Sequence, residues 1–337
     1  MKILVIQTAF IGDVILTLPL VQAIKEYFKN SEIHFVVIPV AKNLLDNHPA
    51  ISKIIVFDKK RNDSGLTGLL RITKSLREHE YDIALVPHRS LRSALLAKIS
   101  NIPKRIGFST SSGKFLFTNV VLPENLSHEI DRNLSLLTPL GYKKRERILP
   151  SLYPSASDKK KVAEFLSPIQ NKIIAIAPGS VWNTKKWLKE NFIELVVQFT
   201  KAGFSVVLIG GKEDEHLCEE IKAKIHSHLV LNSAGKFSLL QSAALLQRCT
   251  LLVCNDSAPL HIAVAMRTPV VAIFGATVPQ FGFYPYGEKD IVIEVENLAC
   301  RPCGIHGGDK CPIETFECMK NISTEMVFRK VKEKLLQ

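Results

Sequence analysis

The stretch "KILVIQTAFIGDVILTLP" (residues 2–19) joins a short apolar run to an apolar segment of helical length, with an acid at the junction. Residues 2–6 lack polar alternation, which is typical of a strand buried on both faces of a parallel sheet. A helix is expected at about residues 14–29. Gly12 permits a tight turn, and an acid in the first helical turn interacts favourably with the helix dipole. Asp13 is therefore either a helix cap or a catalytic carboxylate, which the dipole would help to keep ionised at neutral pH.

The same alternation of apolar runs and helical segments continues along the 337 residues. Further strands are expected at residues 33–38, 53–57, 82–86, 172–177, 205–210, 250–254 and 269–275. These short runs predict an α/β protein with two Rossmann-like, doubly wound domains. A polar stretch with two prolines, residues 142–161, separates the two arrays. We expect domains at 1–155 and 156–320 and a C-terminal helix at 321–337, one option being that this helix packs back on the first domain.

The positive charge lies mainly in the first half of the chain. Residues 1–150 contain 22 Lys and Arg against 13 Asp and Glu, and the remainder contains 22 against 19. This excess suits nucleic acid, anionic lipid or a phosphorylated substrate, the alternative being a merely solubilising surface. No helix-turn-helix, zinc-finger spacing or basic-aromatic stripe supports a nucleic-acid partner. No apolar run is long enough to span a bilayer and Asp13 interrupts the first one, so we expect a cytoplasmic protein without a signal peptide.

Ligands of open α/β sheets bind at the carboxyl ends of the strands, so the residues after each apolar run are candidates for a site. After 172–177 come Gly179, Ser180 and Lys185, which fit a phosphate or diphosphate unless this is a surface loop with incidental lysines. The acids after 205–210, which include Asp214, either bind ribose hydroxyls or only open the next helix.

The most specific of these motifs follows the run at 250–254. Asp256 or Ser257 can cap a helix there, and His261 lies about one turn further on. Backbone N–H groups with a nearby imidazole favour a second anion site over a buried structural histidine. The chain lacks a Walker loop, a G-x-G-x-x-G after the first strand, a G-x-S-x-G elbow and a His-Glu-x-x-His pair. Triphosphate cleavage, nicotinamide-dependent dehydrogenation, serine hydrolysis and zinc proteolysis are therefore not expected.

Four motifs, spread along the chain in order, resemble those of the inverting ADP-heptose:lipopolysaccharide heptosyltransferases of glycosyltransferase family 9, heptosyltransferase II in particular. They are "ILVIQTAFIGDVILTLPLVQAIK" at the start, "IPKRIGF" (102–108), "APGSVWNTKKW" (177–187) and "NDSAPLHIAVAMRTPVVAIFGATVP" (255–279). The resemblance implies the glycosyltransferase-B fold, in which two Rossmann-like domains face each other across a cleft. It implies ADP-heptose as the donor and no cofactor or divalent metal.

Position by position, the resemblance makes Asp13 the general base, which takes the proton of the attacking acceptor hydroxyl. The residues that it implies for donor binding are Ser180, Lys185, Asp214, Phe237, Asp256, Ser257 and His261. Among these, Asp214 would contact the ribose, Phe237 would line the adenine pocket and Asp256 would hold heptose hydroxyls. Ala258 stands where the family usually has Gly.

The implied acceptor is an anionic, lipid-linked inner-core oligosaccharide at the inner face of the bacterial inner membrane, which suits peripheral membrane contact by a basic first domain. The residues expected to bind it are His88, Arg89, Arg92 and Arg105, with Arg61 and Lys104 as further contributors. The alternatives are another nucleotide sugar or acceptor within the family, a noncatalytic sugar-nucleotide-binding module and, on charge alone, a nucleic-acid-binding protein.

Four cysteines gather near the C-terminal end of the sequence. Cys300, Cys303, Cys311 and Cys318 have the spacing C-x2-C-x7-C-x6-C, with His306 between them. The first pair has the spacing of zinc ligands but the second does not. A structural metal, packed free thiols and a redox pair all stay open.

Overall fold

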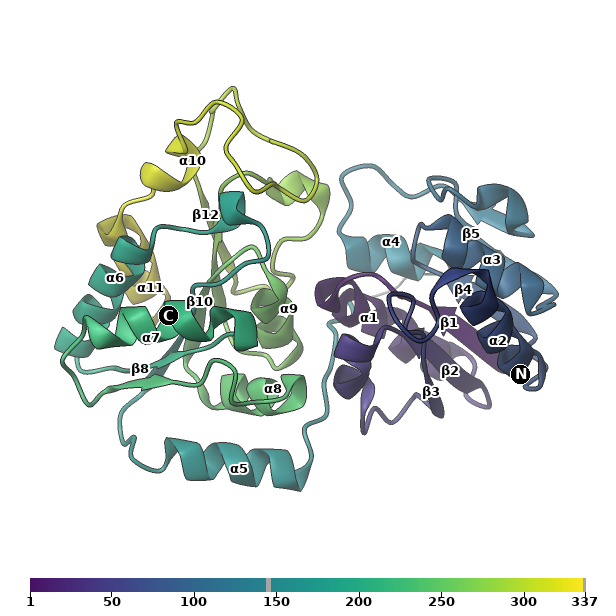
Figure 1. Ribbon diagram of the computed structural model, residues 1–337, viewed down its shortest axis with the longest axis horizontal. Coiled ribbons are helices and arrows are strands. Elements are labelled where there is room, and N and C mark those ends of the chain that lie inside the picture. Colours follow the sequence, from purple (N-terminus) through teal and green to yellow (C-terminus); the bar gives the residue numbers. More distant parts are fainter. Residues whose placement is uncertain (144–146, 336–337) are drawn as a thin grey trace. The chain divides into compact units, whose positions relative to one another are not determined.

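The computed structural model describes residues 1–143 and 147–335, and the chain divides into two compact units, Met1–Tyr153 and Pro154–Gln337 (Figure 1). Each unit is built on a six-stranded sheet in which every strand pair is parallel. The predicted pair of doubly wound α/β domains is thereby confirmed. Residues 144–146 of the expected linker and 336–337 of the expected last helix lie outside the described residues.

The first sheet has the strand order β3-β2-β1-β4-β5-β6. Its strands are β1 (Lys2–Ile6), β2 (Glu32–Val37), β3 (Lys53–Val56), β4 (Ile83–Val86), β5 (Lys104–Phe108) and β6 (Asn119–Val121). The helices of this unit are α1 (Ile11–Tyr27), α2 (Gly65–Arg77), α3 (Leu91–Ile99) and α4 (Glu129–Ser135). Short 3-10 helices occur at η1 (Pro39–Leu45), η2 (Lys114–Leu116) and η3 (Thr138–Leu140).

The second sheet has the order β12-β11-β10-β7-β8-β9. Its strands are β7 (Ile173–Ala177), β8 (Ser205–Leu208), β9 (Val230–Asn232), β10 (Leu251–Asn255), β11 (Val270–Phe274) and β12 (Ile291–Glu294). The helices are α5 (Ala156–Leu166), α6 (Lys189–Lys201), α7 (Glu215–Ala223), α8 (Leu239–Arg248), α9 (Ala258–Ala265), α10 (Glu317–Lys320) and α11 (Thr324–Leu335). The 3-10 helices are η4 (Asn183–Lys185), η5 (Lys212–Asp214) and η6 (Pro279–Phe281).

Both sheets have the same topology when the strands of each unit are counted in chain order. In each, the first strand pairs with the second on one side and with the fourth on the other, β1 with β4 and β7 with β10. In each sheet the connections run in opposite directions on the two sides of this central pair. Folds of this kind bind ligands in the crevice beyond the carboxyl ends of the two strands. The segments that follow these four strands are therefore the place to look for a site in each unit.

Helix α1 is buried along most of its length, since Val14 to Val21 are all covered by the first unit. It packs against α4, where the Asn133 amide donates a hydrogen bond to the Leu16 carbonyl over 3.1 Å. Burial of its apolar side chains, each contributing about 1.5–3 kcal/mol, fixes the helix and its N-terminal Asp13 on the sheet.

The C-terminal helix α11 packs against α6 and β11 of its own unit. Val327 and Val331 on this helix are fully buried in the second core. The apolar face of this helix is therefore covered by the second unit. None of the helices in the described part of the chain combines the length and apolar character that a bilayer crossing requires.

Candidate active site

Asp13 is the third residue of α1 and follows the carboxyl end of β1. Its Oδ2 accepts a hydrogen bond from the backbone N–H of Phe10 over 3.2 Å, so the side chain does cap the helix start. Burial, and next the charge of Glu129, raise the pKa of this half-buried carboxyl to about 6, against the Phe10 hydrogen bond and the charge of Arg89. The expected effect of the helix dipole is thus outweighed. At pH 7 the carboxylate is still mainly ionised and is well matched to accept a proton.

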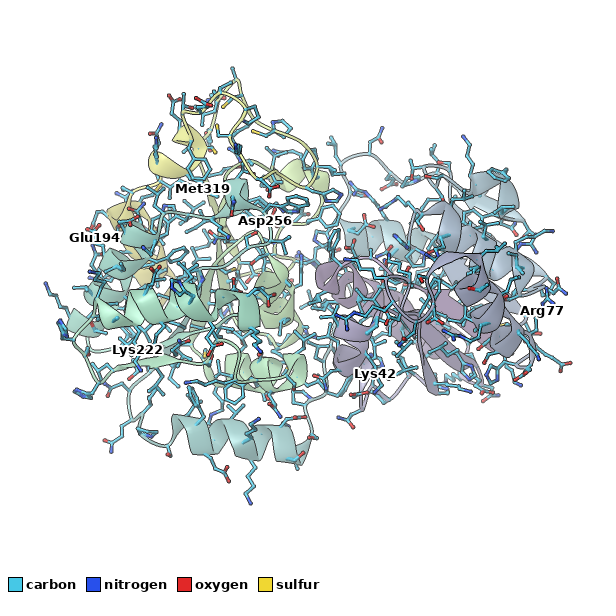
Figure 2. The ribbon with its side chains drawn as sticks, in the orientation of Figure 1. Lys42, Arg77, Glu194, Lys222, Asp256 and Met319 are labelled. Carbon is cyan, nitrogen blue, oxygen red and sulfur yellow. The ribbon has the colours of Figure 1, made fainter. Side chains whose placement is uncertain are left out.

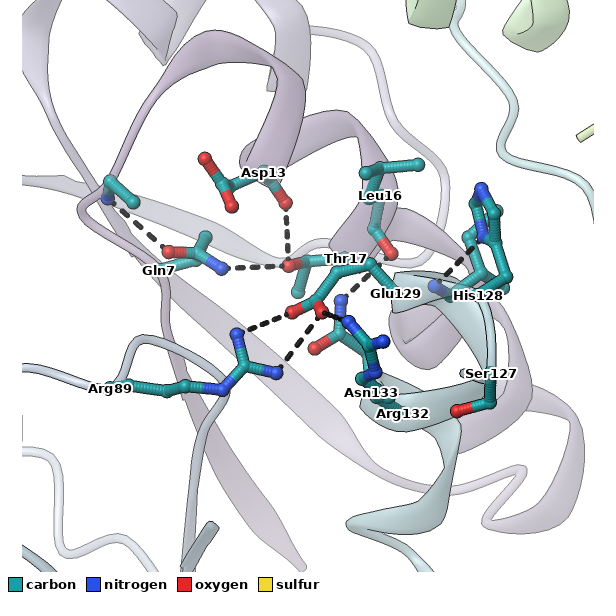
Figure 3. A network of polar contacts seen from close by, with 12 residues as sticks. Gln7, Asp13, Leu16, Thr17, Arg89, Ser127, His128, Glu129, Arg132 and Asn133 are labelled. Atoms are coloured by element: carbon teal, nitrogen blue, oxygen red, sulfur yellow. Dashed lines mark hydrogen bonds and ion pairs between the residues drawn. The ribbon is translucent and has the colours of Figure 1, made fainter. Parts of the chain in front are cut away.

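Glu129 begins α4 and is buried beside Asp13 (Figure 3). Its two oxygens bind both ends of the Arg89 guanidinium, Oε1 to Nη1 over 2.9 Å and Oε2 to Nη2 over 3.0 Å. Arg132 Nη1 adds a third contact to Oε2 over 3.1 Å. Two arginines therefore compensate one buried carboxylate. Sequence reasoning missed Glu129, since an acid at the start of a short helix looks like an ordinary dipole partner.

Arg89 was expected to bind the acceptor. In the structure its guanidinium is committed to Glu129 and also lies over the Phe108 ring, 4.7 Å from the ring centre. Its positive charge also acts to lower the pKa of Asp13. Arg89 therefore lies beside the candidate base, and its contact with an acceptor stays a prediction.

His88 follows β4 and reaches across to the segment after β1. Its Nδ1 lies 3.0 Å from Thr8 Oγ1 and 2.8 Å from Ser93 Oγ. Burial, followed by the charges of Lys59 and Arg89, lowers the pKa of His88 to about 4, so the imidazole is neutral at pH 7. His88 therefore offers hydrogen bonds and no positive charge.

Lys59 lies near His88 and brings a positive charge that the neutral imidazole lacks. Its ammonium donates to the Thr8 carbonyl over 2.6 Å, and burial lowers its pKa, helped by the nearby charges of Arg92 and Lys60. Lys59 was not among the expected site residues. The signal for it was available, because it follows β3 in the same way that His88 follows β4.

The guanidinium groups of Arg92 and Arg105 donate hydrogen bonds to backbone carbonyls. Arg92 Nη2 donates to the Asp63 carbonyl over 2.5 Å and to the Gly65 carbonyl over 3.2 Å. Arg105 donates to the carbonyls of Leu116, Ile102 and Pro103. Arg105 and its neighbour Lys104 also begin β5, level with the first residues of β4. They therefore lie at the amino edge of the sheet, opposite the carboxyl edge that carries His88.

In the second unit, Lys185 of η4 and Asp256, which follows β10, form an ion pair. Lys185 Nζ lies 2.6 Å from Asp256 Oδ2, and the two side chains are only 13% and 8% exposed. The Thr277 hydroxyl donates to the same Oδ2 over 2.7 Å. Figure 2 labels Asp256 within this unit. The two motifs singled out after β7 and β10 thus meet at one point.

His261 lies in the first turns of α9, close to this ion pair. Burial, and next the charge of Lys185, lower the pKa of His261 to about 3, so its imidazole is also neutral. Ser257 caps α9 without a side-chain bond to the helix and donates weakly to the Asn255 carbonyl over 3.4 Å. A helix start, a neutral imidazole and a lysine are groups that together can bind an anion.

Asp214 lies against two glycines that follow strands β7 and β8. A Cβ atom on Gly179 would lie 2.0 Å from Asp214 Oδ1, and one on Gly210 would lie 2.5 Å from Asp214 Cβ. Asp214 Oδ2 accepts the Gly211 N–H over 3.0 Å, and burial raises the pKa of the carboxyl. The glycines therefore permit the close approach that brings Asp214 beside the Ser180 turn.

Asn255 at the end of β10 ties this edge of the sheet together, and sequence reasoning did not assign it a role. Its Oδ1 accepts the Trp187 N–H over 3.0 Å, and its Nδ2 donates to the Pro178 carbonyl over 2.8 Å.

Phe237 lies before α8, where its ring packs edge-on against Phe165 of α5 with centroids 5.1 Å apart. Apart from Phe237, which lies further along the sheet, the expected donor residues gather around the carboxyl ends of β7, β8 and β10.

Cys300, Cys303, Cys311 and Cys318 are not joined by disulfide bonds in the structure, and Cys318 is buried. Among the described residues, no three His, Cys, Asp or Glu side chains form a group that could hold a metal ion.

Residues 69–307 match the profile of glycosyltransferase family 9 (heptosyltransferase). The chain belongs to this family. The resemblance inferred from the four motifs is confirmed, and the protein is a glycosyltransferase. It is 28% identical to lipooligosaccharide heptosyltransferase 2 of Haemophilus influenzae, with 99% of each chain covered. It is 27% identical to lipopolysaccharide heptosyltransferase 2 of Escherichia coli, with 83% of this chain and 84% of that one covered.

Solved structures confirm the glycosyltransferase-B fold of this family 9 enzyme. The family 9 glycosyltransferase of Veillonella parvula superposes with a TM-score of 0.90 at 24% identity, covering 99% of this chain and 97% of that one. The ADP-heptose lipopolysaccharide heptosyltransferase II of Escherichia coli superposes with a TM-score of 0.83 at 24% identity, covering 100% and 99%.

Proposed function

We propose that this enzyme transfers heptose from ADP-heptose to the inner core of lipopolysaccharide, inverting the anomeric centre, with Asp13 as the general base. The observation that carries the proposal is the state of Asp13, a half-buried carboxyl at the carboxyl end of β1 whose pKa is raised to about 6. A base with this pKa is ionised at neutral pH and yet retains real affinity for a proton. The names of the relatives supply the donor and the acceptor.

In the proposed reaction the acceptor hydroxyl attacks the anomeric carbon as Asp13 removes its proton. The new C–O bond forms while the bond from the anomeric carbon to the β-phosphate oxygen breaks, and ADP leaves with that electron pair. Lys185, His261 and the start of α9 stabilise the charge that develops on the diphosphate. Electrostatic stabilisation of this kind is commonly the largest part of the rate enhancement.

Donor binding would loosen the Lys185–Asp256 pair, because phosphate oxygens compete for the ammonium group that Asp256 now holds. The Asp256 carboxylate would then be available to heptose hydroxyls, and Asp214 to the ribose hydroxyls. Ser180 and Ser257 add hydroxyl groups at the same sheet edge, and Phe237 remains the proposed contact of the adenine.

In the first unit, the acceptor would meet His88 and Lys59, since these side chains lie at the carboxyl edge of the sheet together with Asp13. We also propose peripheral contact with the inner face of the inner membrane. The charge excess of residues 1–150 favours anionic lipid, and Phe115, Leu122 and Leu126 are 74–80% exposed in the same unit. Co-sedimentation with vesicles should require anionic lipid and weaken in a variant with serine at these three positions.

The test of the reaction uses ADP-heptose, a defined inner-core acceptor and three proteins, namely wild type, Asp13→Ala and Lys185→Met. We expect Asp13→Ala to lower kcat on the order of 100-fold or more while ADP affinity stays within about twofold. Lys185→Met should instead weaken ADP binding on the order of tenfold.

Substantial transfer by Asp13→Ala would refute the role of Asp13 as the base. Transfer from a different nucleotide sugar, or to a different acceptor, would keep the mechanism and change the substrate. Strong retention on DNA without ADP binding would refute the enzymatic proposal in favour of nucleic-acid binding.

A further inference from the structure

The loop that joins β12 to α10, at the yellow end of the colours in Figure 1, is anchored at its start by Arg301. This side chain is 6% exposed and donates to four acceptors. They are the carbonyls of Gly275 and Val295, each over 2.5 Å, the Thr277 carbonyl over 2.8 Å and Glu294 Oε2 over 2.7 Å. Since the Thr277 hydroxyl binds Asp256, Arg301 ties the loop to the strand end that supports the ion pair.

The same loop is anchored a second time on η4, the turn that carries Lys185. The Gly308 N–H donates to Thr184 Oγ1 over 2.8 Å, and the Thr184 N–H donates to the Gly308 carbonyl over 3.0 Å. Gly307 has a φ of +80°, and a Cβ atom on it would lie 2.9 Å from Thr184 Oγ1 and 3.3 Å from Lys185 Cγ. The backbone of the loop therefore packs directly on the Lys185 turn.

His306 lies beside this second contact, next to the turn that carries Lys185. It directly precedes Gly307 and is exposed, as is its neighbour Ile305. Partial loss of solvent around its imidazole lowers the pKa of His306, the charge of Lys185 adds to that effect, and the charge of Asp256 opposes it. Both members of the ion pair thus lie within electrostatic reach of His306.

We propose that His306 is a further donor-binding residue, whose imidazole donates a hydrogen bond to the diphosphate of the nucleotide sugar beside Lys185. The inference rests on the proposed function, since it assumes that a diphosphate binds at Lys185. A diphosphate presents more acceptor oxygens than one ammonium group can bind, and a loop anchored on both sides of the ion pair holds a second donor ready at low entropic cost. Arg301 acts in this arrangement as a positioning residue.

The test compares wild type, His306→Ala, His306→Gln and the control His216→Ala, using ADP, AMP and ADP-heptose as calorimetric probes. His216 is a matched control because it is an 87% exposed histidine on α7 of the same unit. We expect His306→Ala to weaken ADP on the order of tenfold and to leave AMP within about twofold, because hydrogen bonds to charged groups are among the stronger ones. His306→Gln, which keeps an N–H donor, should recover most of the loss, and His216→Ala should match wild type.

Equal ADP affinities for wild type and His306→Ala would overturn the inference and leave the proposed function intact. A loss confined to ADP-heptose would overturn the diphosphate contact, because it would place His306 against the sugar. A wild-type protein that binds no ADP would refute the proposed function, and the donor role of His306 with it.

Discussion

Arg89 and Glu129 form a two-point ion pair, with N–O distances of 2.9 and 3.0 Å, next to the Asp13 carboxyl group. The two residues are 40 positions apart in the sequence. The pair brings a negative and a positive charge to bear on Asp13, and the negative one has the larger effect on its pKa. The pKa of the proposed base, which burial raises most, is therefore also raised by α4, an element distant from α1 in the sequence.

The first prediction concerns the pH dependence of the wild-type enzyme. A base with a pKa of about 6 is protonated in acid, so kcat/KM should fall about tenfold per pH unit below pH 6 and level off above pH 7. Initial rates between pH 4.5 and 8.5 at limiting ADP-heptose measure this. A profile that stays flat down to pH 4.5 would contradict the raised pKa.

Replacing Glu129 by Gln should move that acid limb. The substitution removes the negative charge that raises the Asp13 pKa and leaves the positive charges of Arg89 and Arg132, so the limb should shift to lower pH on the order of one unit. It should also destabilise the first unit by about 3–5 kcal/mol, because two arginines lose their buried partner. Glu124→Gln, on an exposed loop residue of the same unit, is the control for both the rate profile and urea unfolding.

The Asp13→Asn variant should be more stable than wild type at neutral pH. Because the folded-state pKa of Asp13 is raised from 3.8 to about 6, folding becomes less favourable as the pH rises between these values. The penalty is complete above pH 6 and absent below pH 3.8. Thermal unfolding should give the Asp13→Asn protein the higher Tm at pH 7.5 and no advantage near pH 3.5. A lower Tm at pH 7.5 would show that the Phe10 hydrogen bond outweighs the burial of the charge.

Gly179→Ala should destabilise the second unit through Asp214. The new Cβ would lie 2.0 Å from Asp214 Oδ1, so the side chain or the strand end must move, at a cost of about 1–3 kcal/mol. Introducing the same change into an Asp214→Ala background removes the clash and should cost clearly less. Urea unfolding of the four proteins in this double-mutant cycle gives the coupling. Additive costs would contradict the proposed steric contact.

The seven thiols should differ widely in reactivity. Burial alone would raise the pKa of Cys311, but hydrogen bonds from four backbone N–H groups, those of residues 313–316, outweigh it and lower the pKa. Burial raises the pKa of Cys249 to about 12. Iodoacetamide at pH 7.5, followed by mass spectrometry over time, should label Cys311 first and Cys249 only on unfolding, because the thiolate is the reactive form. Early labelling of Cys249 would contradict its burial.

Seven central strands and the edge strand β3 could be predicted from the sequence because each is a run of apolar residues, and all of these except β3 are buried. β5, β6, β9 and β12 were not predicted, and the last three lie at or form sheet edges, where an exposed side weakens the apolar pattern. The burial of β6 and β12 is correspondingly incomplete. Edge strands acquire their structure from the neighbour that they pair with, which is a long-range property.

The candidate site also contains some residues that the sequence could reveal and others that it could not. Local sequence relations predicted some of the candidates, because each of them follows a strand or opens a helix. They are Asp13, Lys185, Asp256 and His261. Glu129, Thr277 and His306 reach the site through packing between distant segments, as the bond from Gly308 to Thr184 illustrates. For Arg92 and Arg105 the charge alone did not reveal that backbone carbonyls bind both guanidinium groups, and their acceptor contact stays a prediction.

The parallel arrangement of both sheets has one more consequence. Every helix that directly follows a strand in these units starts from the carboxyl edge of its sheet, so the partial positive charges of several peptide dipoles add up along that rim. This electric field belongs to the backbone. It would persist after neutralisation of any single lysine and would draw anions toward the rim even before a side chain touches them.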